Sequence, residues 1–162
     1  MIGEDPKMAE DYVVKLSHIY RYILQHIDKK YITLADGTDF IKSYIGLFNM
    51  RYDNAIVLHA DDLHGDRNEC ILSLSLQLII ENAVKHNSIT GGNPLHIRIR
   101  TEGESILIEN NYTPRSDGDK ESLGMGLERI RSVYRFYTEE NISISVGDGT
   151  FRCRLPLLPP EK

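Results

Sequence analysis

The segment Ser75–Asn87, SLQLIIENAVKHN, constrains the fold of this chain more than any other stretch. At about 100° per residue its apolar side chains fall on one arc, with the spacing of a helix that faces a core. These side chains are Leu76, Ile79, Ile80, Ala83 and Val84. The opposite arc is polar except for Leu78, and it holds Gln77, Glu81, Asn82, Lys85 and His86. The pattern predicts an amphipathic helix whose polar face is either solvated or binds a ligand.

Three of these polar residues suit phosphate chemistry. The amide oxygen of Asn82 is a neutral, hard ligand of the kind that Mg²⁺ accepts beside phosphates. Lys85 follows almost one turn later, where an ammonium group can meet phosphate charge. Glu81 has two interpretations, since its carboxylate can polarise an attacking group or form an ion pair with Lys85 at i+4. The helix therefore supports a nucleotide-site hypothesis beside the simpler interpretation of a solvated face.

Two glycine motifs follow along the chain. Gly124 and Gly126 precede an amphipathic pattern, and small residues at a helix N-terminus let free N–H groups approach a phosphate. Gly149 and Thr150 lie between two alternating, strand-like segments. That second motif predicts either an ordinary hairpin turn or a further ligand contact.

Taken in order, the polar helix and the two glycine motifs resemble the N box and two later glycine boxes of the GHKL ATP-binding superfamily. The segment LQLIIENAVKHN is most similar to LytS-type sensor histidine kinases, and the resemblance covers nearly the whole chain. It implies a protein-histidine kinase that uses ATP and Mg²⁺, moving the γ-phosphoryl group to a histidine and then to a response regulator. It implies catalytic roles for Glu81 and Asn82, with Asn82 as the ligand of Mg²⁺.

The resemblance also implies a set of nucleotide contacts. They are Lys85, His86, Asn110, Gly124, Gly126, Leu127, Gly149 and Thr150. Asn87 is expected beside His86 at the mouth of the site. Relatives carry Asp-x-Gly after the central strand, whereas this chain reads ENNY at residues 109–112, which puts Asn110 in place of the aspartate. An amide oxygen can still accept from the adenine amino group, but because an amide also donates, weaker discrimination against guanine is expected.

A second departure concerns the general base. Relatives often carry another polar residue four positions before the N-box asparagine, and here that position is Leu78. The segment at residues 112–122 has turn-forming residues and no apolar stripe, which is typical of a surface loop. We interpret it as the lid over the nucleotide.

The remaining pattern predicts an α/β fold. Helices are expected from Asp5 to about residue 27 and from a Thr33–Asp36 capping box to about residue 52. Strands are expected near residues 55–59, 95–100, 106–108, 142–146 and 151–155, each with an apolar face, so helices should cover one side of the sheet. The predicted fold is a two-layer α/β sandwich with a mixed, mainly antiparallel sheet, preceded by a helical hairpin. The predicted domains are a hairpin at residues 1–53, remaining from a dimerisation and phosphotransfer region, and an ATP-binding domain at residues 54–162.

Composition limits the partners. The net charge of −5 supplies no strong basic field, which argues against nucleic acid as a partner. Cys70 and Cys153 lack metal-ligand spacing, and a reducing compartment is the simpler interpretation. With no apolar run near the ~20 residues of a membrane span, the resemblance implies a cytoplasmic domain of a longer sensor in the plasma membrane, homodimeric at full length.

Three further expectations complete the sequence-based hypothesis. The family's Pro-His-Phe-type acceptor motif does not occur, and His18 and His26 lie without its flanking residues, so self-phosphorylation is not expected. One alternative is a nucleotide-binding or interaction domain without catalysis, which the altered adenine box favours. Another is an ATP-hydrolysing conformational machine, which the short lid argues against.

Overall fold

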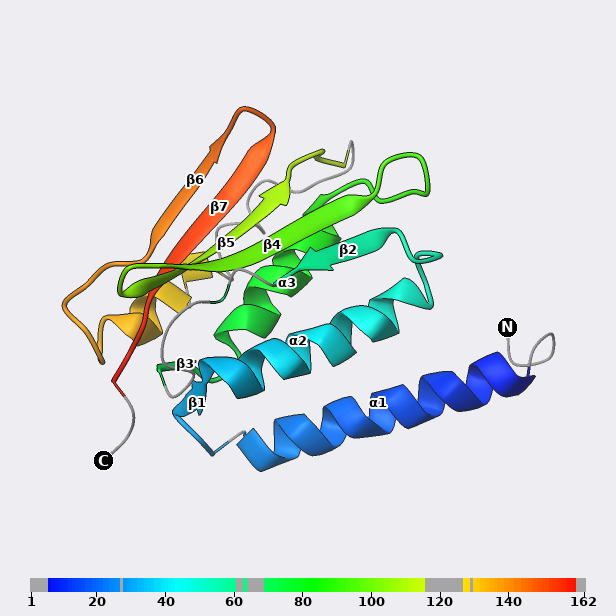
Figure 1. Cartoon of the computed structure of the whole chain (residues 1–162), viewed down its shortest axis with the longest axis horizontal. Helices are drawn as coiled ribbons and strands as arrows, with labels where there is room; N and C mark the ends of the chain where they lie inside the picture. The colour runs from blue at the N-terminus through cyan, green and yellow to red at the C-terminus, as the bar shows by residue number, and fades with distance from the viewer. Residues whose placement is uncertain are drawn as a thin grey trace.

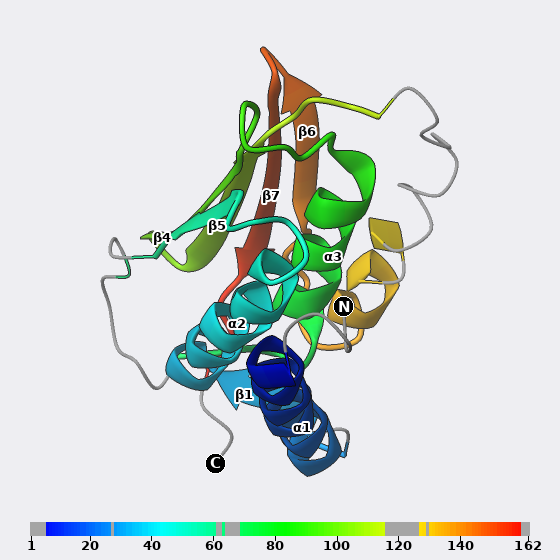
Figure 2. The same cartoon turned by 90° about the vertical axis from the view of Figure 1, so that its right-hand side faces the viewer.

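A computed structural model of the chain describes residues 6–26, 28–60, 63, 69–115, 127–128 and 130–159. A five-stranded sheet forms one layer, and helices pack on one of its faces (Figures 1 and 2). The helices are α1 Pro6–His26, α2 Leu34–Asn49 and α3 Ser75–His86, and a further helical segment includes residues 127–128 and 130–134. The main strands are β2 Ile56–His59, β4 Leu95–Glu102, β5 Ser105–Asn111, β6 Ser143–Gly147 and β7 Thr150–Pro156.

The sheet has the order β2-β4-β5-β7-β6. The β2–β4 pair is parallel, and the other three pairs are antiparallel. The predicted two-layer fold with a mixed, mainly antiparallel sheet is therefore confirmed. The register aligns Ile97, Asn110 and Phe151 across three neighbouring strands. Because alternate residues face opposite sides of a sheet, these three point toward the helices.

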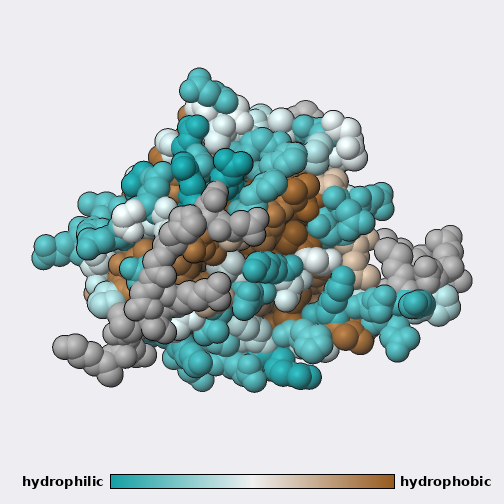
Figure 3. Space-filling model, in the orientation of Figure 1, coloured by the Kyte–Doolittle hydropathy of each residue, from teal (hydrophilic) through white to brown (hydrophobic). Residues whose placement is uncertain are grey.

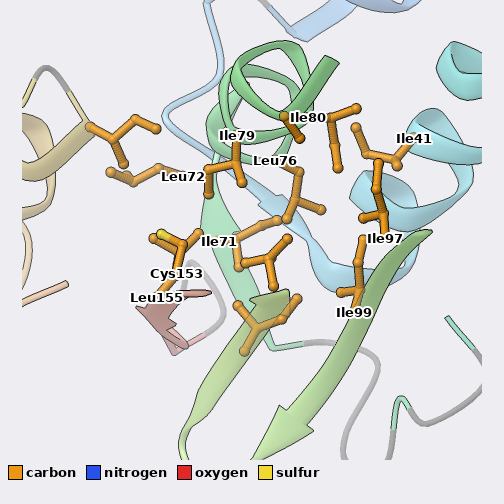
Figure 4. Close-up of a cluster of buried hydrophobic side chains, with 14 of the residues drawn as sticks. Ile41, Ile71, Leu72, Leu76, Ile79, Ile80, Ile97, Ile99, Cys153 and Leu155 are labelled. Atoms are coloured by element: carbon orange, nitrogen blue, oxygen red, sulfur yellow. The ribbon is translucent and has the colours of Figure 1, made fainter. Parts of the chain in front are cut away.

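The core lies between the sheet and the helices. Along β4 the side chains of Leu95, Ile97 and Ile99 are buried, and the alternating residues face the other side of the sheet. All five residues of the predicted apolar arc of α3 are buried as well. Figure 4 shows Leu76, Ile79 and Ile80 of α3 meeting Ile41 of α2 and the inner face of the sheet. The periodicity of α3 and the alternation of β4 thus fix the same core from both sides.

Helices α1 and α2 form the predicted hairpin, and α2 joins the core (Figure 1). Thr33 is the N-cap of α2, with its hydroxyl oxygen accepting from the backbone N–H of Asp36 at 3.1 Å. Gly37 is buried where α2 packs closely, since a Cβ there would lie 3.1 Å from side-chain atoms of Ile32 and Ile71. This glycine therefore permits a close approach that outweighs its low helix propensity.

Two short strands were not predicted. Strands β1 Tyr31–Thr33 and β3 Cys70–Leu72 form a separate antiparallel pair, and the backbone of Cys70 also bonds to that of Leu158. Three residues are too few for an alternating pattern, so the sequence signal for such strands is weak. This small sheet closes the end of the core where α2 begins.

The molecular surface is mostly hydrophilic in the view of Figure 3, where apolar side chains show as patches between polar ones. Both cysteines are buried, as expected of small hydrophobic residues. Burial raises the pKa of the Cys153 thiol to about 12. Within the part of the chain that the structure describes, no helix is long and apolar enough to cross a membrane.

Candidate functional site

A small hollow lies between the C-terminal half of α3 and the inner face of the sheet. It is lined by Asn82, Ala83, His86, Asn87, Asn110, Tyr112 and Phe151. Its free volume is about 10 Å³, roughly the room of one water molecule. Besides Tyr112, four of the lining residues carry polar side chains, and three of these four belong to α3 or its C-cap. The polar face of α3 is therefore turned partly inward rather than wholly to solvent.

The side chains of Asn82 and Lys85 have no partner among the described residues. The Asn82 amide is half-buried at the hollow and makes no hydrogen bond to the described residues. Lys85 is exposed and has no ion pair with those residues. Both groups are consequently available to a ligand that approaches the outer edge of α3.

Glu81 points toward α2 instead of the hollow. Its Oε1 accepts hydrogen bonds from the Tyr44 hydroxyl and from Nε2 of Gln77, the latter at 2.9 Å. The alternative ion pair with Lys85 is wrong, because no such pair forms although both residues are described. The competing donors belong to α2 and to the preceding turn of α3, so the carboxylate is already held.

His86 is buried, although the sequence placed it on the polar arc. Its side chain faces the hollow, and Nε2 has no hydrogen-bond partner. Burial lowers the pKa of His86 below its usual 6.5, and the nearby charge of Lys85 adds to this effect. The imidazole is therefore neutral at pH 7.

The lowered pKa of His86 predicts a loss of stability in acid. Below pH 6.5 the unfolded chain takes up a proton that the folded chain binds only at lower pH, so the free energy of unfolding falls as pH falls. One proton contributes at most about 1.4 kcal/mol per pH unit. Urea unfolding between about pH 7 and pH 5 should show a shallower pH slope for His86→Leu than for the unsubstituted chain. Equal slopes for His86→Leu and the unsubstituted chain would contradict the assignment.

Asn87 ends α3 and anchors the start of the predicted lid. Its Nδ2 donates to the carbonyl of Ala83 at 2.7 Å, and its Oδ1 accepts from the backbone N–H of Thr113 at 2.7 Å. The backbones of Ser88 and Thr113 are also joined, and the N–H of Arg115 donates to the carbonyl of His86. The structure thus places residues 112–115 along the end of α3. Residues 116–122 of the predicted lid lie outside the described residues.

Asn110 presents an unsatisfied acceptor to the hollow. Its side chain is 3% exposed, Nδ2 donates to the carbonyl of Asn111 at 2.7 Å, and Oδ1 has no partner. A buried polar atom without a partner costs roughly 1–3 kcal/mol, so such atoms in native proteins call for an explanation. A ligand that donates a hydrogen bond into this hollow supplies one, and an adenine amino group is such a donor.

Several other predicted nucleotide contacts do not line this hollow. Thr150 pairs with Asn111 and lines a different hollow on the open face of the sheet. Gly149 has φ of +66° beside Asp148 at +52°, which makes the motif the two-residue hairpin turn between β6 and β7. Leu127 is buried in the core. Gly124 and Gly126 lie outside the described residues.

Three lining residues were not predicted as part of the site, namely Ala83, which the sequence placed on the apolar arc, Tyr112 and Phe151. Phe151 follows Thr150 and faces the hollow, because alternation along β7 turns it to the inner side. Tyr112 follows β5, and its backbone N–H donates to the carbonyl of Gly149 at 2.7 Å. The signal for Phe151 was present in the alternation, whereas nothing local marked Tyr112.

No set of three or more His, Cys, Asp or Glu side chains among the described residues is arranged to hold a metal ion. A metal at this site would therefore rely on the Asn82 amide together with oxygens of a ligand. That donor set fits Mg²⁺, which usually binds through one or two protein oxygens plus phosphate and water.

Solved structures of the same architecture define the class of fold. The Acinetobacter baumannii histidine kinase AdeS matches 90% of this chain and 76% of its own, with a TM-score of 0.50 and 16% sequence identity. The cytoplasmic segment of histidine kinase QseC matches 94% of this chain and 95% of its own, with a TM-score of 0.50 and 12% identity. At these identities the comparison shows a histidine-kinase fold and nothing finer.

Sequence comparison gives the family. Residues 1–56 match the family model described as histidine kinase. An uncharacterized sensor-like histidine kinase of Staphylococcus epidermidis is 31% identical over 98% of this chain, which spans 34% of that protein. The sensor protein kinase HptS of Staphylococcus aureus is 32% identical over 82% of this chain and 24% of its own length. The chain belongs to the sensor histidine kinases and spans about a quarter to a third of the length of these relatives.

Proposed function

We propose that the chain is the ATP-binding catalytic part of a two-component sensor histidine kinase, of the LytS type within the GHKL superfamily. The observation that carries the proposal is the pairing of the unbonded Asn82 amide with the buried, partnerless Oδ1 of Asn110 at one hollow. The first suits a metal-phosphate group and the second suits an adenine amino group. An adenine nucleotide with bound Mg²⁺ carries both groups.

In this proposal each polar residue of α3 has a separate role, and two glycines outside this helix contribute as well. Asn82 would hold Mg²⁺, which when bound neutralises phosphate charge and orients the γ-phosphoryl group. Lys85 meets the remaining phosphate charge from its exposed position. Glu81 serves the accepting histidine as a base. Gly124 and Gly126 are proposed to offer backbone N–H groups to the phosphates.

Entry of the base requires the hollow to widen. The present free volume is about 10 Å³, whereas ligand pockets commonly measure about 300–1,000 Å³. Tyr112 is half-buried at the rim, where its side chain packs against the core and its backbone N–H donates to the carbonyl of Gly149. We propose that a rotation of this side chain opens the site. Residues 112–122 would then close over the nucleotide as a lid.

A calorimetric titration with ATP tests the proposed function. Because the proposal places Mg²⁺ between Asn82 and the phosphates, binding should depend strongly on Mg²⁺. Saturable ATP binding that is lost on adding EDTA is expected. If the chain binds no ATP with Mg²⁺ present, the catalytic proposal fails, and a family member that has lost catalysis becomes the better interpretation; the narrow hollow favours that alternative.

Asn110 variants should separate adenine recognition from folding. Asn110→Leu removes the acceptor, and ATP should bind about tenfold more weakly, near the value of one hydrogen bond in a buried site. Asn110→Asp keeps an acceptor and should retain ATP binding. Calorimetry gives both affinities, with Asn141→Ala as an exposed control. Complete loss of binding in Asn110→Asp would place the adenine contact elsewhere.

The same contact bears on base selectivity. The expected weak discrimination against guanine assumed that the amide N–H groups of Asn110 are free to donate. Nδ2 donates one of its two N–H groups to the carbonyl of Asn111, so the amide can still both accept and donate. We therefore propose that Oδ1 accepts from the adenine amino group and that discrimination against guanine is weaker than in relatives.

The wider context is proposed from the family. A response regulator is the proposed recipient of the phosphoryl group, the full-length protein is proposed to be a homodimer in the plasma membrane, and this part is proposed to be cytoplasmic. Residues 1–53 are proposed to remain from the dimerisation region, and residues 54–162 to be catalytic. The accepting histidine is proposed to be neither His18 nor His26, since His26 is buried with Nδ1 at 2.8 Å from the carbonyl of Tyr22.

A further inference from the structure

A stack of rings runs from α1 into α2. The rings of His26 and Tyr22 lie 4.0 Å apart at 22°, and Tyr22 lies 4.0 Å from Phe40 at 14°. Phe40 lies 5.5 Å from Tyr44 at 17°. Phe48 meets Tyr44 edge-on, at 4.9 Å and 74°. The ring of Tyr44 is thus packed against two rings of its own helix, and Phe40 connects it to Tyr22 of α1.

The hydroxyl group of Tyr44 contacts α3. It donates to Oε1 of Glu81, the same oxygen that accepts from Nε2 of Gln77. Burial raises the pKa of Tyr44 well above its usual range, and the bond to the Glu81 carboxylate raises it further. The phenol therefore remains protonated and remains a donor at neutral pH.

The two donors leave the carboxylate with one free oxygen. Oε2 of Glu81 makes no hydrogen bond or ion pair with the described residues, and the side chain is only half-buried. A glutamate side chain otherwise loses up to about 2 kcal/mol of rotamer entropy when it is fixed. Here that ordering is already achieved before any substrate binds.

We propose that Tyr44 is a positioning residue for phosphoryl transfer: it fixes Oε1 of Glu81 so that Oε2 faces the accepting group. The placement of this carboxylate then depends on the placement of α1 and α2. The inference rests on the proposed function, in which Glu81 acts as the base. A displacement of about 1 Å in such a group can cost about 100-fold in rate.

If the hydrogen bond between Tyr44 and Glu81 only linked α2 to α3, its removal would have different consequences. Loss of a tether lowers stability and weakens every property of the site together. Loss of a positioning contact lowers the maximal rate and leaves the KM for ATP in place, because Glu81 lies away from the hollow that would hold the nucleotide. The split between these two parameters therefore distinguishes the roles.

The test compares Tyr44→Phe with the unsubstituted chain. Phenylalanine keeps the ring stack and removes only the hydroxyl. Transfer from labelled ATP is measured to a family-type histidine-bearing helix added in trans. The maximal rate should fall on the order of tenfold, the range of one charge-assisted hydrogen bond, with KM changed less than about twofold. Tyr52→Phe, whose hydroxyl has no hydrogen bond to the described residues, is the matched control and should behave normally.

Two further measurements make the result decisive. Combining Tyr44→Phe with Glu81→Gln should give a rate no lower than Glu81→Gln alone, because the tyrosine acts through the glutamate. In a spectrophotometric alkaline titration, Tyr44→Phe should remove one late-ionising tyrosine, and Glu81→Gln should move one toward the usual range. An unchanged titration in Glu81→Gln would overturn the contact itself.

The outcomes separate this inference from the proposed function. A chain that binds Mg-ATP and transfers the phosphoryl group equally well with Tyr44→Phe overturns only the positioning role. A change confined to KM does the same. A chain that fails to bind Mg-ATP, or binds it without any transfer, overturns the catalytic proposal and this inference with it.

Discussion

Replacing Asn82 by alanine should reduce the affinity for Mg-ATP on the order of 100-fold, about 2.8 kcal/mol. In the proposed function the Asn82 amide oxygen is the protein ligand of Mg²⁺, and it lines the same hollow as Asn110. Without this ligand, the proposed metal and phosphates would lose their contact with α3. Calorimetric titrations with and without Mg²⁺ measure the effect, and the variant should no longer respond to the metal.

Stability serves as the control for this change. The Asn82 side chain makes no hydrogen bond to the described residues, so its loss should alter the free energy of unfolding by no more than about 0.5 kcal/mol. Asn82→Asp keeps an oxygen ligand and should recover part of the Mg²⁺ response, while exposed Asn141→Ala should match the unsubstituted chain. If Asn82→Ala binds Mg-ATP normally, the metal role assigned to this residue is wrong.

The sequence predicted the helices and the main sheet because their patterns are long. The apolar arc of α3 and the alternation of β4 each repeat over several residues, and both were correct in position and in buried face. Strands β1 and β3 were missed because three residues cannot repeat a pattern and their pairing joins segments far apart. The close approach at Gly37 also depends on that pairing, because the side chains it meets are Ile32 of β1 and Ile71 of β3.

The site was less predictable than the fold. Asn82, His86 and Asn110 do meet at one hollow, but Thr150 lies on the other face, since one step along β7 reverses the side chain. One interpretation of the i+4 spacing paired Glu81 with Lys85, yet its carboxylate is bound by Gln77, one turn earlier on α3, and by Tyr44 of α2. Helix geometry allows either neighbour on α3, but it contains no information about Tyr44, which is a tertiary neighbour.

The shared core predicts the largest effect on stability. Ile97 is fully buried in β4, between the sheet and helices α2 and α3 (Figure 4). Ile97→Ala removes its outer methyl groups from this packed space and should lower the free energy of unfolding by about 2–5 kcal/mol. That is a large share of the roughly 5–15 kcal/mol that stabilises most domains. Urea unfolding should show a lower midpoint with an unchanged slope.

Val146→Ala is the matched control for the core variant, since Val146 is 49% exposed on the edge strand β6. It should change the free energy of unfolding by less than about 1 kcal/mol. A midpoint shift in Ile97→Ala no larger than that of Val146→Ala would contradict a core that joins α2 to the sheet. Because Ile97 does not line the hollow, Mg-ATP affinity measured where Ile97→Ala is still folded should stay close to that of the unsubstituted chain. An unchanged affinity would separate the core that supports α3 from the amides of Asn82 and Asn110, which we propose bind the nucleotide.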